Sequence, residues 1–173
     1  MPAPARPDRS EVPEYYHRYV VLVPDGDIVR TLRSQIEETW RLLGALPEER
    51  AGFRYGPEKW SVKEVVGHLS DSERVFAYRC LRFARADQTP LPGFEQDDYV
   101  VNGGFDARTL RDLLEEFGAV REATIRLASS LDQEAGARRG TASERVVSAR
   151  GLLYIIAGHE LHHRRVLVER YLA

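Results

Sequence analysis

The chain has 173 residues, of which 43% are hydrophobic and 30% charged, a balance typical of one globular domain and not of a disordered chain. Its net charge of −2 offers no basic surface for a nucleic-acid backbone, and no segment resembles a secretory signal or a membrane span. Cys80 is the only cysteine, so no disulfide forms within the chain, and we expect it to be a small core residue. We therefore predict a cytoplasmic protein that binds neither nucleic acid nor membrane.

The N-terminal region divides into two parts. Residues 1–14 are rich in proline and are predicted to form a flexible tail, whereas residues 15–173 are predicted to form a single domain. The aromatic segment 15–23 is closed by the turn sequence Pro24-Asp25-Gly26. We expect this segment to lie over the surface of the helices that follow.

Two helices are predicted in the first half of the domain. Apolar residues recur at spacings of three and four from Asp27 until Pro47 stops the helix. The sequence Ser61-Val62-Lys63-Glu64 has the serine and glutamate of a capping box, which predicts a second helix from there to about Ala86.

Two further helices are predicted in the second half. Residues 87–105 show no period and are expected to be a functional or interface loop, after which Asp106 begins a helix that ends near Asp132. A polar connection over 133–147 leads to a last helix capped by Ser148. Four amphipathic helices without a convincing strand pattern predict an all-α fold, a four-helix bundle.

The last helix carries histidines on its apolar face. Two histidines four residues apart project from the same face and can share one metal ion at bond lengths of roughly 2.1 Å. His159 and His163 have this spacing, and elsewhere in the chain His68 is the only histidine placed in the middle of a predicted helix. We predict that these three residues bind one divalent metal ion. The alternative is three histidines that pair with polar neighbours or lie at a wet end of the bundle.

Two other interpretations concern the same segment. The sequence His159-Glu160-Leu161-His162-His163 fits the H-E-x-x-H pattern of zinc peptidases, in which the glutamate is the general base. Val166 stands where the extended motif has glycine, and few residues follow, which disfavours a peptidase. His162 lies three residues from His159 and is a geometric competitor of His163, although the apolar stripe favours His163 as the ligand.

Longer stretches of the sequence resemble a known family. Residues 60–74 and 158–163, the Arg-Tyr pair at 18–19 and the Pro-Gly-Phe-x-x-Asp-Asp loop at 92–98 are similar to the DinB-like, or YfiT-like, metalloenzyme superfamily with its DinB_2-type domain. The similarity extends over nearly the whole chain.

The resemblance implies a bundle with up-down-down-up connections and one metal ion, often zinc or nickel, held by three histidines. The family's ligand positions match His68, His159 and His163. The resemblance also implies a homodimer, and the family includes thiol S-transferases that use bacillithiol, mycothiol or glutathione.

Three neutral nitrogen ligands leave a metal ion with its full charge and an open position, where the pKa of a bound thiol or water falls. Zinc, nickel, iron and cobalt all suit such ligands. Our first hypothesis is thiol transfer to an electrophilic small molecule. The alternative is metal-dependent hydrolysis with Glu160 or Asp71 as a proton shuttle, and a third hypothesis is a metal-binding stress-response protein without turnover.

The long loop contains four polar candidates: Asp97, Asp98, Tyr99 and Asn102. They either line the mouth of the site, form a dimer contact, or are ordinary polar loop residues without a function.

Overall fold

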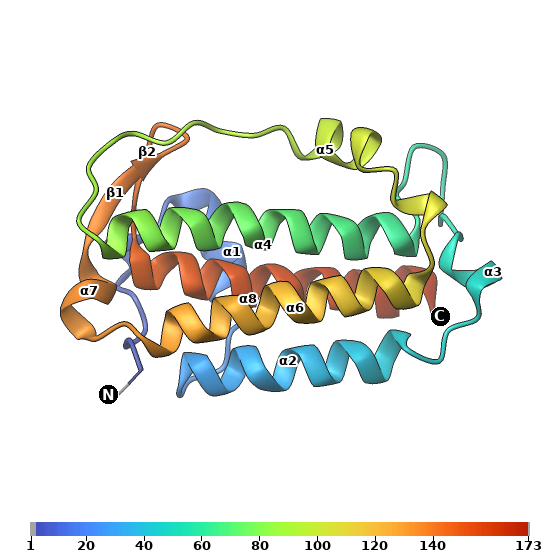
Figure 1. Ribbon diagram of the computed structural model, residues 1–173, viewed down its shortest axis with the longest axis horizontal. Helices are drawn as coiled ribbons and strands as arrows, with labels where there is room; N and C mark the ends of the chain where they lie inside the picture. Colours follow the sequence, from blue (N-terminus) through green and yellow to red (C-terminus); the bar gives the residue numbers. More distant parts are fainter. Residues whose placement is uncertain (1–2, 173) are drawn as a thin grey trace.

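A computed structural model describes residues 3–172 of the chain and shows a four-helix bundle (Figure 1). The four long helices are α2 (Ile28–Leu43), α4 (Val62–Ala84), α6 (Leu110–Ser129) and α8 (Ala149–Val166). In Figure 1, α2 and α8 run in one direction while α4 and α6 run in the other. The predicted all-α bundle with up-down-down-up connections is therefore confirmed.

Shorter elements connect these helices or cover them. The remaining elements are α1 (His17–Val20), α3 (Glu48–Ala51), α5 (Gln96–Gly103), α7 (Gln133–Ala137), β1 (Arg139–Ala142), β2 (Arg145–Ser148), 3-10 turns at Arg9–Glu11, Glu14–Tyr16 and Phe105–Ala107, and a π-helical turn at Leu167–Tyr171. The α4–α6 connection returns along the length of the bundle, which makes these two helices parallel. This connection contains α5, which the sequence analysis did not predict.

Each bundle helix begins at a side chain that accepts hydrogen bonds from its first turn. Asp27 caps α2, Ser148 caps α8, and Ser61 with Glu64 forms the predicted capping box of α4. These three helix starts are confirmed. The predicted cap of α6 was wrong, because Thr109 holds that position.

Asp106 has a different role from the predicted one. Its carboxylate accepts a 2.6 Å hydrogen bond from the Ser61 hydroxyl and pairs with Arg54 at 2.5 Å. Asp106 therefore ties the start of α4 to the segment that precedes α6.

The prediction of no strands was wrong for the segment before α8. Strands β1 and β2 form an antiparallel hairpin, with Ala142 paired to Arg145 across a two-residue turn. The turn residues Ser143 and Glu144 both have positive φ, at 50° and 61°, as a type I′ turn requires. Asn-Gly or Asp-Gly normally indicates such a turn, so Ser-Glu gave no local signal.

The N-terminal segment is packed against the bundle, which differs from the flexible tail expected for residues 1–14. Pro4 and Pro7 are buried, and the amide of Gln133 donates a 2.7 Å hydrogen bond to the carbonyl of Ala3. Glu11 is buried and pairs through both carboxylate oxygens with Arg150 at the start of α8. The apolar prolines and this ion pair hold residues 3–14 in place, while residues 1–2 lie outside the described part.

The Glu11–Arg150 pair predicts a pH-dependent contribution to stability. The hydrogen bonds from Arg150 lower the pKa of Glu11 to about 2, whereas an unfolded glutamate titrates near about 4.3. At pH values above the pKa of the unfolded chain, this lowered pKa stabilises the folded state. The stabilisation is lost as the pH falls toward the folded-state pKa of about 2. We expect Glu11→Gln to cost about 1–3 kcal/mol at pH 7 and progressively less between pH 5 and pH 2.

Urea unfolding of the two proteins at several pH values measures this difference. Glu14→Gln is the matched control, because Glu14 is exposed and forms no ion pair within residues 3–172. A cost of Glu11→Gln that stays constant down to pH 2 would contradict the assignment.

The core consists of two apolar clusters with a polar layer between them. Leu32, Phe76, Ile125 and Ile156 belong to one cluster, and Leu43, Leu69, Phe117 and Leu167 belong to the other. Between them, all four bundle helices contribute buried polar side chains, which we call the polar layer: Gln35, Thr39, His68, Ser72, Glu73, Arg121, Thr124, His159 and Glu160. None of the described helices is long and apolar enough to cross a lipid bilayer.

Candidate metal centre

His68, His159 and His163 meet where α4 packs against α8. The Nε2 atom of His159 lies 3.1 Å from Nε2 of His68 and 3.1 Å from Nε2 of His163. One ligand nitrogen from each ring lies within 4.8 Å of the others, and residues 3–172 contain no other such group of histidine, cysteine, aspartate or glutamate. The structure thus brings together the three residues that the sequence analysis selected.

These distances suit a shared metal ion. Tetrahedral coordination with bonds of 2.0–2.1 Å separates two ligand nitrogens by roughly 3.3–3.4 Å. The two observed 3.1 Å separations are close to this value, and the ligand nitrogens of His68 and His163 lie within 4.8 Å of each other. Three nitrogens that face one another offer converging lone pairs, for which a cation is the natural partner.

The protonation state of the site also fits a metal ion. Burial lowers the pKa of His68 to about 4 and moves the pKa of His159 and His163 well below the usual value, with the neighbouring histidines lowering the latter two further. The imidazoles are therefore neutral near pH 7, which is the form that binds metals.

Aromatic side chains surround the three histidines. The Trp60 ring lies 4.6 Å from the His68 ring and 6.4 Å from the His163 ring, nearly parallel to the latter. The Tyr19 ring meets the His159 ring edge to face at 5.4 Å, and the Ser72 hydroxyl lies 3.4 Å from Nδ1 of His68. These contacts fix the ring orientations, as partners behind metal ligands commonly do.

No role in the site was predicted for Trp60, Tyr19 and Ser72. Trp60 directly precedes the capping box of α4, and Ser72 follows His68 by one helical turn. That spacing was the available signal for Ser72. No comparable signal links Tyr19 to a histidine 140 positions later, because tertiary packing alone brings them together.

His162 lies outside the group of three ligand nitrogens. Its ring packs edge to face against Tyr19 at 5.3 Å and against His163 at 5.2 Å. The structure therefore gathers His163 with His159 and His68, while His162 forms part of the surroundings. His17 lies away from this group, within hydrogen-bonding distance of the carbonyls of Arg9 and Val12.

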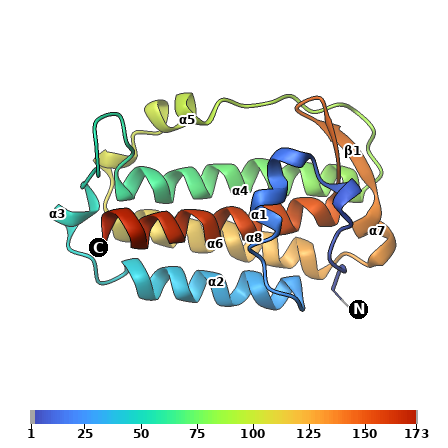
Figure 2. The ribbon, with the colours of Figure 1, turned by 180° about the vertical axis from the view of Figure 1, so that it is seen from behind.

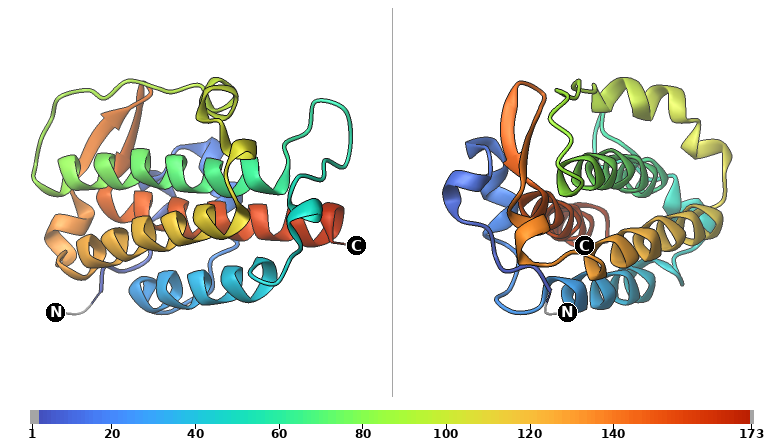
Figure 3. Two further views of the ribbon diagram at one scale, coloured as in Figure 1. Left: turned by 45° about the vertical axis from the view of Figure 1, so that its right-hand side comes forward. Right: turned by 60° about the vertical axis from the view of Figure 1, so that its left-hand side comes forward.

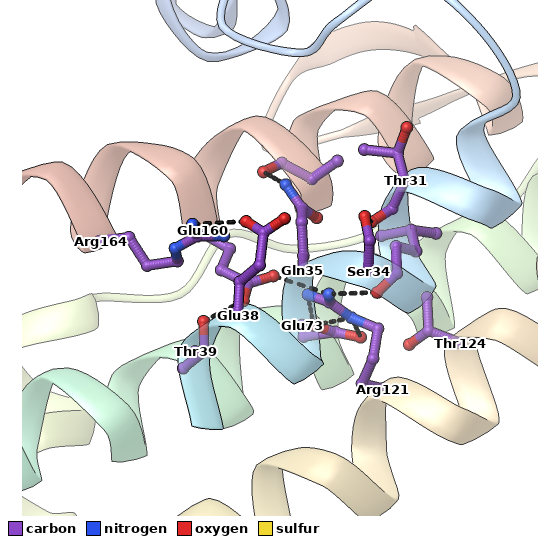
Figure 4. Close-up of polar contacts among 12 residues, drawn as sticks. Thr31, Ser34, Gln35, Glu38, Thr39, Glu73, Arg121, Thr124, Glu160 and Arg164 are labelled. Atoms are coloured by element: carbon purple, nitrogen blue, oxygen red, sulfur yellow. Dashed lines mark hydrogen bonds and ion pairs between the residues drawn. The ribbon is translucent and has the colours of Figure 1, made fainter. Parts of the chain in front are cut away.

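The two candidate proton shuttles lie elsewhere. Glu160 accepts a 2.6 Å hydrogen bond from the Thr39 hydroxyl and pairs with Arg121 at 2.6 Å, within the polar layer toward α2 and α6 (Figure 4). Asp71 pairs with Arg74 at 3.3 Å, and burial raises its pKa. Neither carboxylate belongs to the histidine group. This placement differs from the expected shuttle role, since Glu160 already has buried partners.

Two clefts reach the histidines from outside. One, of about 300 Å³, leads to His159 between Tyr19 and Phe76, and the other, of about 340 Å³, leads to His163 past Trp60. Asp97 at the start of α5 lines both clefts. Of the loop residues considered for the mouth of the site, Asp97 has that position.

A close approach of two backbones sets the position of Tyr19. Helix α1 packs on α8, as Figure 2 shows, and contacts it at Gly158, one residue before His159. A Cβ atom on Gly158 would lie 2.1 Å from the carbonyl oxygen of Tyr19, so any larger residue must push α1 away. Glycine at this position therefore keeps the Tyr19 ring against His159.

We expect Gly158→Ala to lower the free energy of unfolding by about 1–3 kcal/mol through this overlap. Gly118→Ala on α6 is the matched control, because its Cβ would meet only an ordinary 3.7 Å contact with Trp40. The control should be neutral or more stable, since alanine favours a helix by about 1 kcal/mol over glycine. Equal effects in a denaturant titration would show that the backbone approach is unimportant.

The fold and the three-histidine group define an all-helical bundle with a candidate metal centre between two of its helices. The sequence profile of the DinB superfamily matches residues 31–167, more than half of the chain. The protein therefore belongs to the DinB superfamily, as the resemblance predicted.

Solved structures share this fold. YfiT from Bacillus subtilis, described as a probable metal-dependent hydrolase with an unusual four-helix bundle topology, matches with a TM-score of 0.70 and 13% identity, over 96% of this chain and 91% of YfiT. A DinB-like protein of Bacillus subtilis, YjoA, matches with a TM-score of 0.60 and 22% identity, over 82% of this chain and 87% of YjoA. A comparison with curated proteins finds no match.

Proposed function

We propose that the protein is a metal-dependent enzyme that holds one divalent ion through His68, His159 and His163 and transfers a low-molecular-weight thiol to electrophilic small molecules. The observation that carries this proposal is the convergence of three neutral imidazoles, of which His68 and His159 are buried and His163 is half-buried, where one cleft reaches His159 and another reaches His163. When bound, an ion with three imidazole ligands and an open position lowers the pKa of a thiol or water that reaches it.

The chain's own residues favour thiol transfer over hydrolysis. Hydrolysis benefits from a carboxylate that accepts a proton beside the metal, and Glu160 and Asp71 are both engaged with arginines. Cys80 cannot act as an internal nucleophile, because burial raises its pKa to about 12. A small thiol that enters through a cleft would supply the sulfur, and Tyr19 and Trp60 would limit access of water to it.

Metal-dependent hydrolysis is the second candidate. The observation in its favour is the similar fold of YfiT, which is described as a probable metal-dependent hydrolase. In this case the carboxylates near the mouth are Asp97, which lines both clefts, and Glu95 and Glu58, which line one cleft each.

The two reactions are separated by direct assay of the metal-loaded protein. Monochlorobimane with glutathione, mycothiol or bacillithiol should give a fluorescent conjugate faster than the same mixture with His159→Ala. Cleavage of ester or amide probes without conjugate formation would favour the hydrolase. Stoichiometric metal binding without either reaction would contradict an enzymatic role and leave a metal-binding protein of the stress-response type.

Three further properties belong to the proposal. Zinc or nickel is the expected ion, with iron or cobalt also compatible with three imidazoles. A homodimer and a cytoplasmic location are expected from the family resemblance and the cysteine content. Light scattering coupled to size-exclusion chromatography tests the dimer.

A further inference from the structure

A second cavity adjoins the cleft that leads to His159. It has a volume of about 620 Å³ and lies between the N-terminal segment, α4 and the β1–β2 hairpin. Figure 3 shows the backbone of these elements. Tyr15, Tyr16 and Phe76 line both spaces, so the cavity continues the cleft away from the histidines. Its size suits a small-molecule ligand.

Arg79 lines this cavity as a buried cation without an acidic partner. The residue is only 3% exposed, and within residues 3–172 it forms no ion pair. Its recorded hydrogen bonds all come from Nη2, to the carbonyl of Pro92 at 2.7 Å and to the hydroxyl of Ser143 at 3.1 Å. The Tyr16 phenol also interacts with the guanidinium, but no carboxylate does, so the positive charge is left for a ligand to pair with. Glu14 lines the cavity too, but it is exposed and does not pair with Arg79.

Arg121 is buried to a similar degree but, unlike Arg79, has acidic partners. Arg121 pairs with the carboxylates of Glu73 and Glu160. Burying a cation without such compensation is costly, and burial lowers the pKa of Arg79, opposed by the phenols of Tyr16 and Tyr99 and by no carboxylate. Arginine keeps its charge even so, because its ordinary pKa is very high. A buried, charged and unpaired guanidinium beside a cavity is suited to an anionic ligand.

The position of Arg79 relates it to the metal centre. The Phe76 ring lies 6.1 Å from the His159 ring and 5.9 Å from Cζ of Arg79, so the guanidinium is within about 12 Å of His159. One small molecule can span this distance with a polar group at one end and a reactive group at the other. Phe76, together with Tyr15 and Tyr16, would contact its apolar middle.

We propose that Arg79 forms a carboxylate-binding subsite that orients the substrate or the thiol toward the three histidines. This inference rests on the proposed function, since it gives the reacting molecule a carboxylate at the end far from the metal. The planar guanidinium matches the geometry of a carboxylate, and a charge-assisted hydrogen bond is stronger in a buried site than in water.

Calorimetric titration of the zinc-loaded protein with 3-phenylpropionate and with its neutral amide tests the subsite. We expect the wild type to bind the carboxylate at least about tenfold more tightly than the amide. Arg79→Met should lower the affinity for the carboxylate by roughly tenfold and leave that for the amide unchanged. Arg79→Lys should recover part of the loss, and Arg126→Met, which removes an exposed arginine of α6, should have no effect.

Several results would overturn the subsite. Equal affinity of the wild type for carboxylate and amide does so without any variant, which keeps the test valid if Arg79→Met does not fold. The subsite is also overturned if a folded Arg79→Met variant binds the carboxylate as tightly as the wild type does. Displacement of 3-phenylpropionate by an equal concentration of inorganic phosphate would overturn it as well. The proposed function fails separately, through absence of conjugate and hydrolysis products, and the carboxylate preference would then remain measurable.

Discussion

Arg121→Met is expected to lower the free energy of unfolding by about 3–5 kcal/mol, because it leaves two carboxylates buried without their cation. Arg121 is fully buried on α6. It donates three hydrogen bonds to Glu73 of α4 at 2.8, 2.9 and 3.1 Å, pairs with Glu160 of α8 at 2.6 Å and donates a 3.0 Å hydrogen bond to the carbonyl of Leu32 in α2 (Figure 4). One side chain thus joins all four helices of the bundle.

Guanidinium chloride unfolding followed by circular dichroism measures this loss. Arg111→Met is the matched control on the same helix, because Arg111 is 83% exposed and pairs only with Glu115. The control should change stability by less than about 0.5 kcal/mol. The triple variant with Arg121→Met, Glu73→Gln and Glu160→Gln should recover part of the loss, since it removes the buried charges together. A cost of Arg121→Met no larger than that of the control would show that the cluster does not hold the helices.

His159→Ala is expected to remove the metal, from about one ion per chain to a tenth of that or less after dialysis. His159 contributes the nitrogen that lies 3.1 Å from both of the others, so its loss separates the remaining pair. Elemental analysis of the purified proteins gives the metal content directly. Zinc at about 100 times its dissociation constant should also stabilise the wild type by about 2.7 kcal/mol and leave His159→Ala unchanged.

His162→Ala and His163→Ala form a matched pair on the same helix. We expect His163→Ala to lose the metal and His162→Ala to keep it, because only His163 belongs to the group of three ligand nitrogens. The reverse pattern would assign the third ligand to His162, the competitor considered from sequence spacing.

The sequence predicted the bundle and its three histidines because both depend on local periodicity. His159 and His163 interrupt an apolar stripe at a spacing of one turn, and the long stretch around His68 supports the family resemblance. Helix caps at Asp27, Ser61 and Ser148 were predictable for the same reason, since a cap and its helix are adjacent in the chain.

The polar layer was not predicted, because its members are paired across helices. Charged residues stand at stripe positions on α4, α6 and α8, where Glu73 follows Leu69 by four residues and Arg121 follows Phe117 by four. That spacing was the available signal. The local sequence pattern does not show which buried charged residues pair with one another. Glu160 was therefore considered as a proton shuttle, whereas in the structure it pairs with Arg121.

The hairpin, α5 and the packed N-terminal segment were missed for related reasons. Ser143 and Glu144 adopt positive φ without the glycine or asparagine that marks such turns. The N-terminal segment has the composition of a tail, and its order depends on Glu11 meeting Arg150, which is 139 positions away.

X-ray absorption spectroscopy of the protein with one equivalent of zinc tests the central claim most directly. We expect three imidazole nitrogens at about 2.0–2.1 Å, with the remaining coordination supplied by light atoms from solvent. A first shell with fewer than three imidazoles, or one dominated by carboxylate oxygens, would contradict a metal centre formed by His68, His159 and His163.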